Sequence, residues 1–105
     1  MPYLFIKSTY PSHKADEVLK KNLEVVPKYP PDPSLGETVA SASRGVEQGV
    51  ESITIYEVKK GKFDEAMEIW MKGLLEFRNI EGYEMSIEVW PTAAEAFNAI
   101  GMKPP

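Results

Sequence analysis

Two glutamates near the C-terminus have a spacing that could support acid–base chemistry. Glu84, Ser86 and Glu88 alternate within YEMSIEVW, so a strand would place all three side chains on one face. Paired carboxylates act as general acid and base when their surroundings separate their pKa values, and Lys7 could neutralise one of them. The simpler interpretation, which we favour, is a strand with solvated glutamates and an ordinary ion pair.

The remaining candidates for chemistry are isolated residues. His13 is the single histidine, and its place in the first turn of a predicted helix disfavours its charged form. Arg44 could hold an anionic group but has no second basic residue beside it. The lack of cysteine excludes disulfides, thiolate chemistry and cysteine-ligated metals, and no glycine-rich phosphate loop is present. We therefore expect neither a cofactor nor a metal.

A second cluster of candidates lies at helical spacing. Met67, Trp70, Met71 and Phe77 resemble the lining of a cofactor pocket, but an aromatic and methionine stripe of this period is typical of a core-facing helix.

The helices and strands that must position all these residues are predicted from hydrophobic periodicity and from Pro and Gly breakers. We expect strands at 2–10, 38–46, 50–59 and 83–90, helices at 12–26 and 63–79, and a short tail helix capped by Thr92.

This order of elements predicts the fold class. A βαββαβ chain of 105 residues most economically forms one α+β domain, residues 1–105, built as a ferredoxin-like sandwich. Right-handed crossovers give an antiparallel four-stranded sheet of order 4-1-3-2 with two helices on one face. The proline-rich segment 27–37 (PKYPPDPSLGE) is then a stiff loop inside this domain, anchored by Tyr29 and Leu35 on the chain's own tail or on a partner subunit, and residues 92–105 form a C-terminal tail.

One face of the predicted sheet has no helix over it. We place the aliphatic residues Leu4, Ile6, Ile53, Ile55, Met85 and Ile87 towards the helices. Alternation then puts an aromatic patch and several polar residues on the open face, which is typical of an interface or a binding site. The predicted ligand-binding residues on this face are Tyr3, Phe5, Lys7, Tyr56, Glu88 and Trp90, and Thr9, Thr54, Val58, Glu84 and Ser86 share their parity.

The turn VKKGKFDEAM before an aromatic-rich helix and the final GYEMSIEVWPTAAEAF resemble the dimeric α+β barrel superfamily, over nearly the whole chain. This superfamily includes stress-responsive barrel proteins and antibiotic-biosynthesis-type monooxygenases. The resemblance implies a homodimer whose sheets enclose a cavity for small hydrophobic or aromatic molecules. Haem-degrading members use a strand Asn, a helix His and a Trp. This chain has Trp70 but neither of the other two, so the resemblance does not extend to that activity.

Charge and composition limit the other partners. A formal net charge of −4 argues against a general polyanion binder, and VESITIYEVK lacks the basic and aromatic pattern of an RNA-recognition strand. The N-terminus has no signal-peptide or membrane-span pattern, so we expect a cytoplasmic protein with no membrane or nucleic-acid partner. The scarcity of Asn, Gln and Cys suits a thermophile.

Together these features predict a non-enzymatic homodimer, or higher homo-oligomer, assembled through the open sheet face. That face would also bind a small hydrophobic or aromatic ligand. The alternative is a cofactor-independent barrel enzyme, a monooxygenase or an isomerase, that uses Tyr56, Glu88, Lys7 or His13.

Overall fold

The computed structural model describes residues 1–101 and has an α+β architecture. The expected tail 92–105 therefore ends outside the described residues. The elements in chain order are β1 (Tyr3–Tyr10), the 3-10 turn η1 (Ser12–Lys14), α1 (Ala15–Val25), the 3-10 turn η2 (Val26–Lys28), β2 (Gly36–Val46), β3 (Gly49–Val58), α2 (Phe63–Leu75), β4 (Glu84–Trp90) and α3 (Ala93–Ala99).

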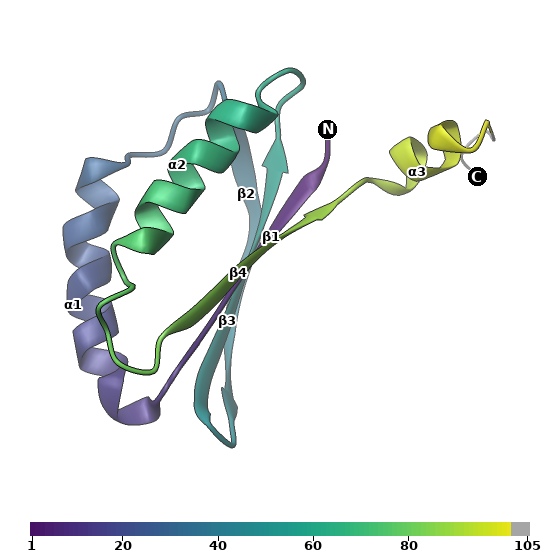
Figure 1. Cartoon of the computed structure of the whole chain (residues 1–105). Coiled ribbons are helices and arrows are strands. Elements are labelled where there is room, and N and C mark those ends of the chain that lie inside the picture. Colours follow the sequence, from purple (N-terminus) through teal and green to yellow (C-terminus); the bar gives the residue numbers. More distant parts are fainter. Residues whose placement is uncertain (102–105) are drawn as a thin grey trace.

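The four strands form one antiparallel sheet in the order β2-β3-β1-β4. Read from the β4 edge, this row of strands is 4-1-3-2. Helices α1 and α2 lie on the same side of the sheet, whereas α3 extends away on the opposite side (Figure 1). The sheet therefore has a helix side and an open side, and each could carry a site.

Several element ends differ from the expected ones for local reasons. Strand β2 begins at Gly36 instead of residue 38 and contains a bulge at Val39, between Thr38 and Ala40. Ser12 makes no side-chain cap, because the chain enters α1 through a 3-10 turn. Helix α2 ends at Leu75 instead of residue 79, since the following backbone forms tight turns with i→i−3 hydrogen bonds.

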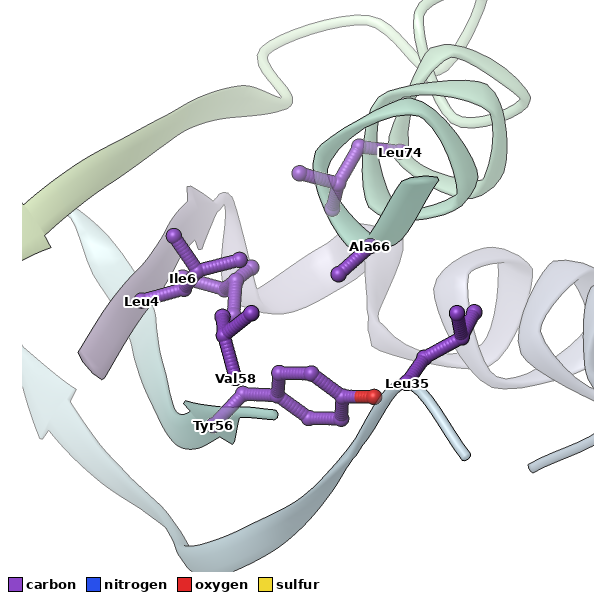
Figure 2. Packing of buried hydrophobic residues seen from close by; sticks show 7 residues of the cluster. All are labelled: Leu4, Ile6, Leu35, Tyr56, Val58, Ala66 and Leu74. Carbon is purple, nitrogen blue, oxygen red and sulfur yellow. The ribbon is translucent and has the colours of Figure 1, made fainter. Parts of the chain in front are cut away.

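Helix α2 closes the main hydrophobic core against the sheet (Figure 2). Leu4 and Val58 are fully buried, and Ala66 is 1% exposed where α2 approaches the strands most closely. The remaining buried members of this cluster are Ile6, Leu35, Tyr56 and Leu74. A second cluster of Val25, Phe77 and Ile80 joins the C-terminal ends of α1 and α2. Of the predicted stripe, Met67, Trp70 and Phe77 thus pack in the core as expected, whereas Met71 is 43% exposed and belongs to neither cluster.

The face assignment of β3 was wrong. Leu4 is paired with Tyr56 across the two strands, and directly paired residues share a face, so Tyr56 and Val58 point to the helices with Leu4. Ile53 and Ile55 therefore lie on the open side. The assignments of β1 and β4 hold: Leu4 and Ile6 are buried, and Met85 and Ile87 pack against the same cluster. The reason for the error is that the helix side of β3 is only partly apolar: it also carries polar side chains, which are described below.

The proline-rich loop is ordered by its own short-range contacts. Asp32 Oδ1 accepts hydrogen bonds from the Ser34 backbone N–H at 3.0 Å and from the Ser34 hydroxyl at 2.6 Å. Leu35 is 5% exposed, and its carbonyl accepts a hydrogen bond of 2.8 Å from the Lys59 N–H. Tyr29 packs on the cluster of Val25. Both residues therefore anchor the loop, but they do so on the core clusters in the body of their own chain and not on the C-terminal tail or a partner subunit as expected.

Helix α3 stands apart from this body (Figure 1). Thr92 caps it as expected: the Thr92 hydroxyl accepts from the Glu95 N–H at 3.1 Å, and the Glu95 carboxylate accepts from the Thr92 N–H at 2.9 Å. Within residues 1–101, its side-chain polar link to the rest of the chain is the ion pair between Glu95 and the Met1 amino group. None of its residues is buried.

Candidate functional site

The open side of the sheet brings together most of the predicted site residues. Phe5 lies between Ile55 on β3 and Glu88 on β4, and Lys7 lies between Ile53 and Ser86. The rings of Phe5 and Trp90 stack with centroids 5.0 Å apart and an interplanar angle of 24°. Trp90 is 51% exposed, so this stack is an uncovered apolar surface. Tyr3 continues the patch beside Trp90.

The polar groups next to the aromatic stack of the open side bond to one another. The Lys7 ammonium lies 3.2 Å from Glu88 Oε1, and the Trp90 indole N–H donates to the same oxygen at 3.0 Å. The hydrogen bonds from Trp90 and Lys7 lower the pKa of Glu88 below its ordinary value. Glu88 is thus held as a carboxylate. Glu84 lies four residues away on the same strand, about 13 Å at ~3.3 Å per residue, so the two glutamates do not form a carboxylate pair.

The two isolated candidates do not join this patch. His13 is exposed in the η1 turn. Arg44 is on the open side of β2, where its Nε donates to Glu51 Oε1 at 2.6 Å. That carboxylate occupies the guanidinium group, so Arg44 already has an anionic partner.

A second candidate site, which the sequence did not predict, lies on the helix side. A groove of about 550 Å³ runs between α1, the proline-rich loop and the helix-facing side of β2 and β3. This volume is in the range of a small-molecule pocket. The groove exists because α1 stands off from β2, whose residues from Glu37 to Gly45 are exposed even though a crossover helix lies on their side of the sheet.

The floor of the groove is a double row of hydroxyl groups. Ser41 on β2 contacts Thr54 on β3 at 3.2 Å, and Ser43 contacts Ser52 at 2.8 Å. Each hydroxyl has one donor and two acceptor sites, so these pairs retain hydrogen-bonding capacity towards a ligand. The sequence analysis placed Thr54 on the open face. Because it assigned the two faces of β3 the wrong way round, it did not predict this row of hydroxyl groups.

The opposite wall is the apolar stripe of α1. Leu19 is 58% exposed and Val26 is 51% exposed, and both line the groove together with Val18. Apolar side chains of this size are usually covered. The wall and the floor thus present an apolar surface facing a hydroxyl surface across one groove.

Aromatic side chains close the groove at the end next to the proline-rich loop. The rings of Tyr56 and Trp70 meet edge to face with centroids 5.4 Å apart, and Tyr29 lines the same end. Burial raises the pKa of Tyr56, and the negative charge of Asp32 raises it further. Tyr56 therefore remains a neutral phenol that can donate or accept a hydrogen bond.

The structure thus separates the six predicted ligand-binding residues. Tyr3, Phe5, Lys7, Glu88 and Trp90 share the open side, whereas Tyr56 belongs to the groove on the other side of the sheet. One sequence signal could have found the groove. Ser8, Ser52 and Thr54 fall at alternate positions in phase with Tyr56 or Leu4, which is unusual for a fully covered sheet face.

Two further features bear on the class of site. None of the helices in residues 1–101 combines the length and the apolar character that crossing a membrane requires. Within the same residues, no group of three or more His, Asp or Glu side chains gathers in a way that could hold a metal ion. Comparisons with protein-family models, with curated proteins and with solved structures find no match for this chain.

Proposed function

We propose that this protein is a homodimeric binding protein for a small, largely apolar molecule held in the groove between α1 and the β2–β3 floor. The observation that carries this proposal is the groove itself, with exposed Leu19 and Val26 facing the hydroxyls of Ser41 and Thr54. An apolar molecule would cover the stripe of α1 and remove its surface from water. The hydroxyls would orient a polar group of the same molecule.

Binding of a neutral hydrophobic dye, N-phenyl-naphthylamine, tests this proposal. Leu19→Asp places a charge on the groove wall and should weaken dye binding by at least tenfold, because an unpaired carboxylate is costly to bury beneath a ligand. Leu23→Asp is the matched control, since Leu23 is 68% exposed on the same helix and does not line the groove. Dye fluorescence measures both affinities.

The proposal predicts different dye affinities for the two leucine variants. Loss of binding in Leu19→Asp with retention in Leu23→Asp supports the proposal. Equal affinities in the two variants, or no dye binding to the unmodified protein, would overturn it. Circular dichroism of both variants checks that α1 stays helical.

We assign the open side of the sheet to a second copy of the chain, in a dimer of ferredoxin-like sandwiches as in the dimeric α+β barrel superfamily. The centre of this side is apolar, with Phe5, Ile55 and Trp90 partly exposed. Two ion pairs lie on this side, Lys7–Glu88 and Arg44–Glu51, whereas Glu37, Glu57 and Glu84 share it and have no ion-pair partner within residues 1–101. Symmetric dimers are the commonest assemblies of soluble proteins.

Helix α3 supports the same assignment. It has seven residues, and isolated helices shorter than about 12 residues are marginal in water. It projects from the open side of the sheet and leaves Ile100 70% exposed (Figure 1). A second copy facing this side would supply the surface that α3 lacks within its own chain.

The alternative function, a cofactor-independent monooxygenase or isomerase, has less support. Its candidate residues do not share one site, because Tyr56 lines the groove while Lys7 and Glu88 lie on the open side. His13 is exposed and lines neither. An enzyme would need several of these groups within reach of one substrate.

A further inference from the structure

The charged residues that line the groove are all acidic. Within residues 1–101, its lining includes no lysine, arginine or histidine, and the two ionisable residues with carboxylates are Asp32 and Glu37. Glu37 pairs with Glu57 across the strands, which directs its side chain to the open side of the sheet, so it lines the groove through its backbone. Asp32 is therefore the charge that a ligand would meet.

Three lysines on the helix side of the molecule are paired with other carboxylates. Lys62 lies 3.7 Å from Glu65, Lys72 lies 3.0 Å from Glu68, and Lys28 lies 3.2 Å from Glu76. Among the described residues, no lysine or arginine nitrogen lies within ion-pair distance of the Asp32 carboxylate. The hydrogen bonds of this carboxylate are those from Ser34 to Oδ1. The hydrogen bonds from Ser34 lower the pKa of Asp32, which keeps it ionised.

Aromatic faces surround the same end of the groove. Tyr29, Tyr56 and Trp70 all line it, and the edge-to-face contact of Tyr56 with Trp70 sets their two rings at 72° to each other. An organic cation is attracted to the face of an aromatic ring, and most strongly to that of Trp. Tyr56 is 9% exposed, so Trp70 and Tyr29, which are less buried, are the rings that a cation could reach most easily. Among the residues that line the groove within residues 1–101, an anionic ligand would find this carboxylate and no basic side chain, and the basic charge that acts on Asp32 is that of Lys62 outside the lining.

We propose that the ligand is an amphipathic organic cation, with its ammonium group between Asp32 and the rings of Tyr29, Tyr56 and Trp70 and its apolar body along α1. This inference rests on the proposed function, because it names the chemical class of the molecule that the groove binds. It excludes fatty acids, organic phosphates and other anions as ligands of this site.

Three molecules with the same apolar body test the charge preference: phenylbutylamine, phenylbutanol and phenylbutyrate, which at neutral pH are a cation, a neutral alcohol and an anion. Trp70 and Trp90 are the two tryptophans of the chain, so Trp90→Phe leaves Trp70 as the reporter of the groove. Titration of Trp70 fluorescence in this background gives the three affinities. We expect the amine to bind roughly tenfold more tightly than the alcohol, and the butyrate to bind most weakly.

Asp32→Asn isolates the carboxylate, because an asparagine oxygen can still accept the hydrogen bonds of Ser34. This variant should reduce the advantage of the amine over the alcohol to roughly twofold and leave the alcohol affinity unchanged. Asp16→Asn is the matched control: Asp16 is exposed on α1 and does not line the groove, so the net charge changes equally while the ligand preference should not.

The outcomes separate this inference from the proposed function. Equal binding of amine and alcohol, tighter binding of butyrate, or the same effect of both Asp variants would overturn the cation preference and leave groove binding standing. Binding of none of the three molecules, together with no dye binding, would overturn both.

Discussion

The two sides of the sheet carry similar kinds of side chain but differ in how these side chains are covered. On the helix side, Leu4 and Val58 are fully buried beneath α2, but the hydroxyls of β2 and the apolar wall of α1 stay apart and leave a groove. On the open side, Phe5 and Trp90 stack on each other with no element of the described chain above them. One side therefore has a closed core beside a concave site, and the other has an uncovered aromatic stack.

This difference shows what decides the partner of each side. A groove with walls surrounds a small molecule and can bury most of its surface, whereas a flat patch buries surface only against another flat patch. We therefore assign the ligand to the groove and the second copy to the open side. Three further predictions test that division.

The largest effect is expected from adjacent residues of β1 that face opposite sides. Leu4→Ala removes buried atoms from the closed core and should lower the free energy of unfolding by about 3 kcal/mol at every protein concentration. Phe5→Ala should instead weaken the dimer, so its effect on stability should fade as the protein is diluted. Denaturant unfolding at several concentrations, with sedimentation to follow the oligomer, measures both.

The comparison fails if these two variants behave alike. A concentration-independent loss in Phe5→Ala equal to that in Leu4→Ala would mean that the open side is part of a monomer core. A monomeric unmodified protein at high concentration would remove the second copy from the proposal.

A smaller effect is expected at the edge of the groove. A Cβ added at Gly36 would overlap the Glu57 carbonyl oxygen and lie 2.7 Å from the Tyr56 ring, so Gly36→Ala should cost about 1–3 kcal/mol and disturb dye binding. Gly45 is at the other end of β2 with nothing within 4 Å of such a Cβ, and Gly45→Ala should change stability by less than about 0.5 kcal/mol. Thermal unfolding and dye titration compare them, and equal effects would contradict the close approach at Gly36.

The smallest effect concerns the polar rim of the open side. The pKa of Glu88 is lowered by the hydrogen bonds from Trp90 and Lys7, so the folded state favours the carboxylate. This contribution is present above the ordinary glutamate pKa of about 4.5 and is lost as the pH falls through the lower folded value. In Trp70→Phe, Trp90 fluorescence should report that loss below pH 4.5. Glu88→Gln should abolish the transition, and a midpoint above the ordinary value would show that the contacts do not favour the carboxylate.

Much of the fold could be predicted from local patterns. Breakers and periodicity located every strand and both crossover helices to within a few residues, and Thr92 was identified as a cap because Glu95 completes its capping box. Tyr29 and Leu35 were identified as anchors because they are the large apolar residues of a proline-rich loop. These are short-range properties, and a few neighbouring residues suffice to produce them.

The candidate site was less predictable. Five of the six predicted residues do share one side of the sheet, but the assignment of Tyr56 was wrong because Ile53 and Ile55 seemed the better core residues. Counting aliphatic side chains assumes that the helix-covered side is dry throughout. The groove breaks that assumption, because the hydroxyls of Ser52 and Thr54 lie on the same side as Leu4 and Val58.

Except at the bulge in β2, the sequence by itself determined which residues of a strand share a face, since alternation is a property of the extended backbone. It did not determine which face the helices cover. The strand register, which pairs Leu4 with Tyr56, and the distance between α1 and β2 determine it. Both depend on contacts between residues far apart in the chain, so the groove, the open surface and the functions we propose for them were decided only by the tertiary structure.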